Sequence, residues 1–167
     1  IGFDLNKNRI QNLKKGIDLN KEHLKREICY NNNSFVTNNV QKIKNCNFFI
    51  VCVPTPITKN NIPDLRLVDK SVSLLAKVIK NGDIIVLEST VYPGITEKFS
   101  KKLSLKVKLD NNKDFFTCYS PERINPGDNS KKLNNIEKIF AIDTNNTAIL
   151  NRIKKIYNLI SKKIIFT

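Results

Sequence analysis

Three nearly continuous apolar runs constrain the fold of this 167-residue chain more than any other feature. They read FFIVCV at 48–53, IIVLES at 84–89 and FFTCYS at 115–120. Their length and their β-branched residues are typical of strands buried on both faces, as in a parallel sheet. Apolar residues at helical spacing, over 65–79, separate the first two runs. We therefore predict an α/β fold, a doubly wound parallel sheet with helices on both faces.

Shorter elements extend this alternation to both ends of the chain. Before the first run we expect a strand at 1–4, a helix that stops near Gly16, a strand at 35–37 and a helix at 40–44. After the second run we expect a helix introduced by Pro93, a strand at 139–142, a helix at 144–157 and a last strand at 164–167. No internal repeat or low-complexity linker divides the sequence, so we expect one domain over 1–167.

The net charge of +14 suggests a nucleic-acid partner, because a basic face neutralises phosphates. The distribution of the charge favours another explanation. The lysines come as scattered doublets among asparagine pairs, and few of the basic residues are arginine, the side chain suited to bidentate phosphate recognition. We expect solvated lysine-rich faces and no nucleic-acid partner.

The cysteines indicate neither a metal site nor a disulfide framework. Cys29, Cys46, Cys52 and Cys118 lie far apart without CxxC spacing, and His23 is the single histidine. Cys52 and Cys118 fall inside apolar runs, so we expect both to be buried small hydrophobes. Because no apolar run approaches the roughly 20 residues of a membrane span, we expect no membrane association and a cytoplasmic location.

Three motifs stand where the predicted strands end. They are VCVPTP at 51–56, ESTVYPG at 88–94 and YSPERINPGD at 119–128. In open parallel sheets, ligands bind outside the carboxyl ends of the strands. The three motifs are therefore expected to meet at one ligand, as in an enzyme.

Asp4 ends the first predicted strand. A carboxylate there can accept hydrogen bonds from both ribose hydroxyls of NAD and repel the 2′-phosphate of NADP. The alternative is a turn aspartate that helps to start the next helix, for which Asn6 also resembles a cap. Arg9 can pack over an adenine or meet a phosphate, although arginines near helix starts are common.

Two strand ends carry hydroxyl side chains. Val53, Pro54 and Thr55 place a proline-stiffened backbone and a hydroxyl beside a cofactor, and Ser89 and Thr90 do the same one strand later. Hydroxyls at strand ends often only make turns. Matching positions in two successive units favour the functional interpretation.

Glu122 is the main catalytic candidate. Pro121 restricts the backbone before it, and a strand delivers its carboxylate to the ligand-binding edge, where desolvation can raise the pKa. The alternative is a surface glutamate paired with Arg123. Arg123 and Asn125 can bind a phosphate or sugar hydroxyls, and Gly127 lets the loop backbone approach closely.

A dinucleotide-binding fold carries GxGxxG between its first strand and helix, and this chain has none. Since Asp4 lies only four residues in, we expect that the first strand and its glycine-rich turn are missing from the N-terminus. The strands at 1–4 and 48–53 then flank a gap or close on each other, and unpaired edges favour aggregation.

Together the three motifs resemble the NAD-binding N-terminal domain of the UDP-glucose/GDP-mannose dehydrogenase family, over essentially the whole chain. YSPERINPGD is most similar to the branch that oxidises UDP-N-acetylglucosamine or UDP-N-acetylmannosamine for surface polysaccharides. The resemblance implies a Rossmann-like fold and NAD-dependent oxidation of the sugar C6 alcohol to a uronate. It also implies a homodimer for the full-length protein. The family's covalent cysteine and a catalytic lysine lie in a later domain, so the chain alone is expected to be inactive.

The resemblance assigns roles to individual residues. It implies catalytic roles for Glu122 and Thr90, and substrate contacts by Glu122, Arg123, Ile124 and Asn125. It implies cofactor contacts by Asp4, Arg9, Val53, Pro54, Thr55 and Ser89. Two other functions stay open on the residues: a noncatalytic polyanion-binding module, and another dehydrogenase of this fold, such as a 6-phosphogluconate-type enzyme.

Overall fold

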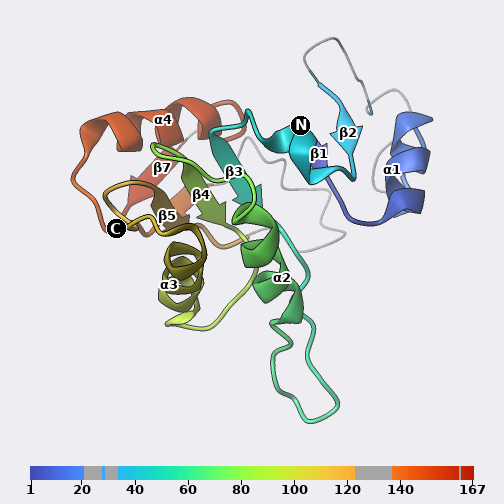
Figure 1. Cartoon of the computed structure of the whole chain (residues 1–167), viewed down its shortest axis with the longest axis horizontal. Coiled ribbons are helices and arrows are strands. Elements are labelled where there is room, and N and C mark those ends of the chain that lie inside the picture. Colours follow the sequence, from blue (N-terminus) through green and yellow to red (C-terminus); the bar gives the residue numbers. More distant parts are fainter. Residues whose placement is uncertain (21–27, 29–33, 123–136, 162) are drawn as a thin grey trace. The chain divides into compact units, whose positions relative to one another are not determined.

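A computed structural model describes residues 1–20, 28, 34–122, 137–161 and 163–167 (Figure 1). These residues form two compact units, Ile1–Cys46 and Asn47–Thr167, which are described separately. Parallel strands alternate with helices in both units, which confirms the predicted α/β class. None of the helices in the described ranges combines the length and the apolar content that a membrane crossing needs.

The first unit holds two short parallel strands and two helices. Gly2 pairs with Val36 and Phe3 with Thr37. Asn6 caps the first helix by accepting a hydrogen bond from the Arg9 N–H at 3.1 Å, and Gly16 follows the helix with a φ of +72°, as the helix-stop prediction required. The elements are β1 (Gly2–Phe3), α1 (Lys7–Lys14), β2 (Val36–Thr37) and the 3₁₀ helix η1 (Val40–Ile43).

The second unit is built on a three-stranded parallel sheet with β4 in the centre, between β3 and β5. Its elements are β3 (Phe48–Val51), α2 (Arg66–Leu75), β4 (Ile84–Leu87), α3 (Ile95–Val107), β5 (Phe116–Tyr119), β6 (Glu137–Phe140), α4 (Thr147–Tyr157) and β7 (Lys163–Phe166). Every residue of β4 is fully buried, as its unbroken apolar run predicted.

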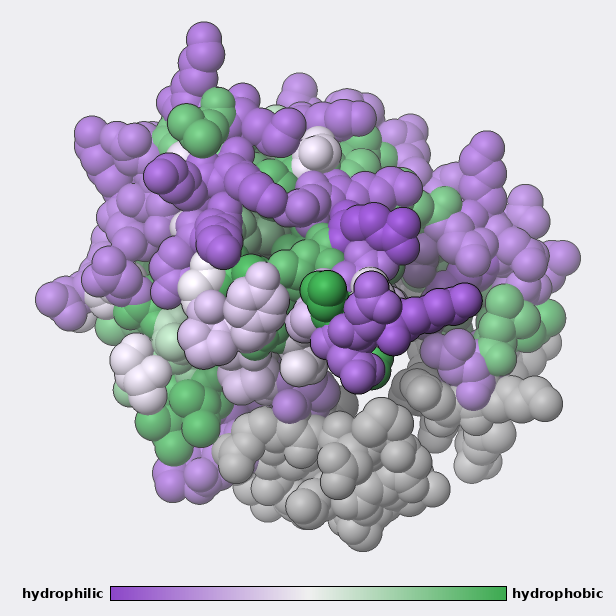
Figure 2. All heavy atoms as spheres, turned by 90° about the horizontal axis from the view of Figure 1, so that it is seen from below, coloured by the Kyte–Doolittle hydropathy of each residue, from purple (hydrophilic) through white to green (hydrophobic). Residues whose placement is uncertain are grey.

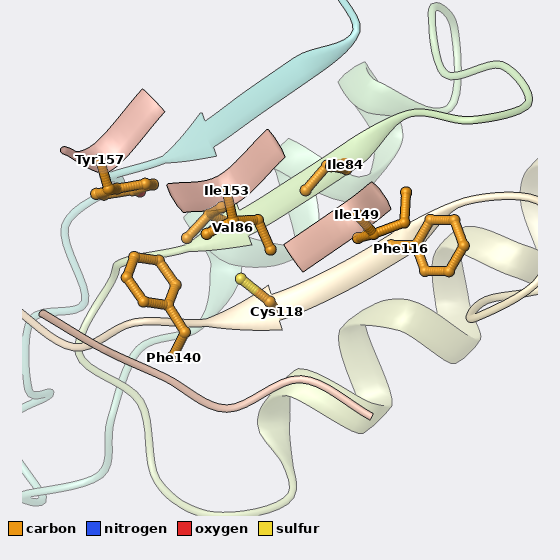
Figure 3. Close-up of a cluster of buried hydrophobic side chains, with 8 residues drawn as sticks. All are labelled: Ile84, Val86, Phe116, Cys118, Phe140, Ile149, Ile153 and Tyr157. Atoms are coloured by element: carbon orange, nitrogen blue, oxygen red, sulfur yellow. The ribbon is translucent and has the colours of Figure 1, made fainter. Parts of the chain in front are cut away.

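Helices cover both faces of this sheet, with α2 and α3 on one side and α4 on the other (Figure 1). Because side chains alternate along a strand, Ile84 and Val86 of β4 share a face with Phe116 and Cys118 of β5. Figure 3 shows that α4 packs on that face. The α4 side chains in this core are Ile149, Ile153 and Tyr157, and Phe140 of β6 joins them.

Several boundaries differ from the sequence expectation. Helix α2 ends at Leu75, before Ile79, because the N–H groups of Lys77 and Val78 donate to carbonyls three residues back and tighten the chain into turns. Strand β6 starts and ends two residues earlier than the strand expected at 139–142. It pairs in parallel with β7, and Ala141, which follows β6, makes an isolated antiparallel bridge with Tyr119 of β5.

Arg152 of α4 fixes the amino ends of two strands. Its guanidinium donates to the Gly82 carbonyl at 2.7 Å and to the Asn47 carbonyl at 3.0 Å. Asn47 directly precedes β3 and Gly82 lies two residues before β4, so one side chain satisfies backbone acceptors at the start of both strands.

Candidate active site

The carboxyl ends of β3, β4 and β5 are joined by backbone hydrogen bonds. The Val51 carbonyl accepts from the N–H groups of Glu88 at 2.9 Å and Ser89 at 3.2 Å. The Ser120 N–H donates to the Leu87 carbonyl at 3.0 Å. The segments that follow the three strands therefore leave the sheet at one edge, as the motifs predicted.

Hydroxyl groups tie the first two of these segments together. Thr55 Oγ1 donates to the Thr90 carbonyl at 2.7 Å, and Ser89 Oγ lies 3.4 Å from the Val51 carbonyl. Ser89 is buried, Val53 is half-buried, and Pro54 and the Thr90 side chain are exposed. The Thr55 and Ser89 hydroxyls thus contact backbone carbonyls of the neighbouring segment, as the structural alternative for strand-end hydroxyls implies. The Thr90 side chain faces solvent.

Glu122 is exposed, whereas the sequence suggested that burial at this edge would remove water from its carboxylate. The described residues around it do not provide that burial. Its charge nevertheless acts on the end of β3, where it contributes to raising the pKa of the Cys52 thiol. Glu122 therefore lies on the same edge as the β3 motif. The expected substrate-binding residues Arg123, Ile124 and Asn125 lie outside the described residues.

Cys52 corrects one expectation and Cys118 confirms another. Cys118 is fully buried, whereas Cys52 is exposed because β3 ends at Val51 and the chain then leaves the sheet. Partial desolvation, followed by the Glu88 carboxylate, raises the pKa of the Cys52 thiol to about 11. The thiol stays protonated near neutral pH and is a poor nucleophile.

A buried polar cluster that the motifs did not reveal lies behind this edge. Lys138 Nζ is 3.2 Å from Glu88 Oε2, and the Tyr157 hydroxyl donates to Glu88 Oε1 at 2.5 Å. The side chains of Lys138 and Glu88 are only 4% and 12% exposed. Burial, and then the hydrogen bond to Glu88, raise the pKa of the Tyr157 hydroxyl. The sequence signal for this cluster was a glutamate directly after a fully apolar strand.

In the first unit, Asp4 follows β1 at its carboxyl end. Its Oδ1 accepts from the Asn6 N–H at 2.8 Å, and its Oδ2 lies 3.7 Å from Arg9 Nε. The Asp4 side chain is 39% exposed, and carboxylate oxygens have further lone pairs. The carboxylate thus makes the local turn of the alternative interpretation and can still accept hydrogen bonds from ribose hydroxyls.

A cavity of about 820 Å³ lies beside this edge, along β5 and the start of α3. Val91, Tyr119, Asn112 and Asp143 are among its lining residues, and none of the expected site residues that the structure describes lines it. The hydrogen-bonded strand ends and their charges therefore define the candidate site better than this cavity does. Among the described residues, no cluster of three or more His, Cys, Asp or Glu side chains is arranged to hold a metal ion.

Comparison with known proteins identifies the family. Residues 1–161 match the UDP-glucose/GDP-mannose dehydrogenase family, NAD binding domain. The chain belongs to this family. The matched domain of this family binds NAD.

Named relatives of the family are nucleotide-sugar dehydrogenases. The chain is 44% identical over 145 residues to UDP-N-acetyl-D-glucosamine 6-dehydrogenase of Salmonella typhi, covering 86% of the chain and 34% of that protein. A Pseudomonas aeruginosa protein of the same name is 43% identical with the same coverage. The chain spans about a third of the length of these curated relatives.

A solved structure supports the fold. The UDP-D-ManNAc dehydrogenase of Pyrococcus horikoshii superposes with a TM-score of 0.85 at 29% identity, covering 99% of the chain and 40% of that structure. The Rossmann-like interpretation is confirmed by this match.

Proposed function

We propose that the chain is the NAD-binding part, over 1–167, of an enzyme that oxidises the C6 alcohol of a UDP-N-acetylhexosamine to a uronate. The observation that carries the proposal is the joining of three strand ends, which presents Thr55, Thr90 and Glu122 at one edge. The 44% identity to a UDP-N-acetyl-D-glucosamine 6-dehydrogenase supports the substrate class.

Different residues of the chain then bind the cofactor, transfer the proton and contact the substrate. When bound, NAD accepts the hydride released from the sugar carbon. By the family resemblance, Asp4 and Arg9 contact the adenosine of the cofactor. By the same resemblance, Val53, Pro54, Thr55 and Ser89 line the cofactor. The exposed Thr90 and Glu122 hold water and accept or return a proton at the Glu122 carboxylate. Arg123, Ile124 and Asn125 contact the sugar nucleotide.

The test is NADH formation by the complete enzyme with UDP-N-acetylglucosamine, UDP-N-acetylmannosamine and UDP-glucose. We expect turnover of an N-acetylated sugar, and Glu122→Gln should lower kcat by about a hundredfold, because a general acid-base group is lost. Glu137→Gln, which changes an exposed glutamate on β6, is the matched control. No turnover of any UDP-sugar would contradict the proposal.

The chain on its own should bind NAD weakly, because it carries no GxGxxG turn. It should produce no NADH, because the resemblance places the family's covalent cysteine in a later domain. Calorimetric titration with NAD and a turnover assay of the chain measure both properties. The complete enzyme is expected to be a cytoplasmic homodimer that serves surface polysaccharide synthesis. Light scattering measures its mass.

The basic surface suggests no second function. On the face drawn in Figure 2, hydrophilic residues predominate and hydrophobic residues form smaller groups. We infer that scattered, solvated lysines contribute to this hydrophilic surface. A salt-dependent DNA shift at physiological ionic strength would contradict this interpretation.

A further inference from the structure

The Glu88 carboxylate is held on both oxygens by side chains from two other elements. Lys138 of β6 lies 3.2 Å from one oxygen, and the hydroxyl of Tyr157, at the end of α4, donates to the other at 2.5 Å. Phe140 packs edge-on against the Tyr157 ring at 4.6 Å and keeps that ring in place. The carboxylate therefore has a defined orientation.

The backbone of the same segment is fixed as well. The N–H groups of Glu88 and Ser89 both donate to the Val51 carbonyl, and the Thr90 carbonyl accepts from Thr55. The Glu88 side chain thus connects β6 and α4 to the three residues that end in Thr90. A shift of Glu88 would move Ser89 and Thr90 with it.

The charged and hydrogen-bonding groups of the cluster are better suited to orienting the Glu88 side chain than to stabilising the fold. Well-packed apolar side chains of similar volume are often as stabilising as a buried ion pair, because both charges must lose water. A charge-assisted hydrogen bond, by contrast, fixes direction and distance. Phe140, which packs on Tyr157, belongs to an apolar core with Ile84 and Val86, so the polar cluster borders that core.

We propose that Glu88 is a positioning residue, whose carboxylate, clamped by Lys138 and Tyr157, fixes the strand-end backbone that carries Ser89 and Thr90. The inference rests on the proposed function, in which Thr90 lies beside the reacting groups. Misplacement of such groups by about 1 Å can cost a hundredfold in rate, so a distant clamp affects turnover.

The main experiment uses the double variant Glu88→Gln/Lys138→Met in the complete enzyme. Gln still accepts the Tyr157 hydrogen bond, and no buried charge remains unpaired, so the fold is kept. We expect kcat to fall about tenfold or more, with KM for the UDP-sugar within about threefold of wild type. Lys163→Met, which removes an exposed lysine from the neighbouring strand, should leave kcat unchanged.

Amide hydrogen exchange supplies a readout that needs no turnover. In the double variant the Ser89 N–H should exchange at least about tenfold faster, because its bond to Val51 opens more often. The Gly82 N–H, bonded to the Asp114 carbonyl at the other end of β4, should be unaffected. Both rates stay at wild-type values in Lys163→Met.

The outcomes separate the two proposals. A folded double variant with wild-type Ser89 exchange overturns the positioning role, whatever its kcat. Faster exchange with an unchanged kcat also overturns it, since the segment would then not govern the reaction. A wild-type enzyme that oxidises no UDP-sugar overturns the proposed function, while Ser89 exchange still decides whether Glu88 fixes the segment.

Discussion

Two neighbouring residues of β6 make ion pairs of opposite character. Glu137 lies 2.6 Å from Lys163, with side chains 46% and 61% exposed, whereas Lys138 lies 3.2 Å from Glu88 with both side chains nearly buried. Water screens the shorter pair, so its net contribution to stability is small. Burial keeps water away from the longer pair, so water cannot stabilise the remaining charge when one partner is removed. Burial, not distance, decides which pair matters.

Lys138→Met alone should have the largest effect, because it leaves the buried Glu88 carboxylate without its counter-charge. We expect the free energy of unfolding to fall by about 3–5 kcal/mol. Adding Glu88→Gln should recover most of the loss. Urea unfolding of the single and double variants measures both, and equal stabilities for the two would break the comparison.

Tyr157→Phe sharpens the comparison within the buried cluster, since it removes only the hydroxyl that donates to Glu88. The ring packing on Phe140 is kept, so the expected cost is about 1–3 kcal/mol for one unsatisfied buried acceptor. Tyr92→Phe, at an exposed tyrosine, is the matched control and should change the unfolding midpoint little. An equal effect of the two variants would contradict this.

Alkaline pH tests burial at the cysteines. Burial raises the pKa of the Cys118 thiol to about 12 from the ordinary value of 9.0, and the pKa of Cys52 rises to about 11. The unfolded chain therefore loses these protons first. The stability that the buried Cys118 thiol contributes should be complete below pH 9 and should fall by about 1 kcal/mol per pH unit as pH rises from 9 towards 12. The exposed Cys52 should contribute less, because solvent screens its charge. In Cys118→Ala, unfolding curves at rising pH should show a shallower fall.

Lys163→Met should have the smallest effect. Removing the partner of Glu137 exposes no buried charge, so we expect a change of about 0–1 kcal/mol in unfolding free energy. High salt should reduce even this difference. A loss as large as that of Lys138→Met would show that distance outweighs burial in this sheet.

The sequence predicted the sheet well because its signals are local. Unbroken apolar runs such as 84–87 occur only where both faces are covered, and the left-handed Gly16 follows its helix as predicted. The common edge at which β3, β4 and β5 end also followed from the rule for parallel strands. These features depend on residues close together in the chain.

The buried cluster of Glu88, Lys138 and Tyr157 could not be predicted from the sequence, because its members are far apart in the chain. Glu88 and Tyr157 are separated by 69 positions, and a lysine on a short strand such as β6 is usually solvated. The exposure of Cys52 was missed for a related reason. Where β3 ends, at Val51, depends on pairing with β4 and not on hydropathy alone.

The two hydrogen bonds from Arg152 bear on the order of events during biosynthesis. They join residues separated by 70 and 105 positions, so the start of β3 waits for more than a hundred further residues before its carbonyl finds this donor. During synthesis on the ribosome, β3 and β4 therefore emerge before these carbonyls have a donor. The two hydrogen bonds form only after α4 has been made. Nascent chains halted before that helix should be the ones that chaperones and proteases recognise.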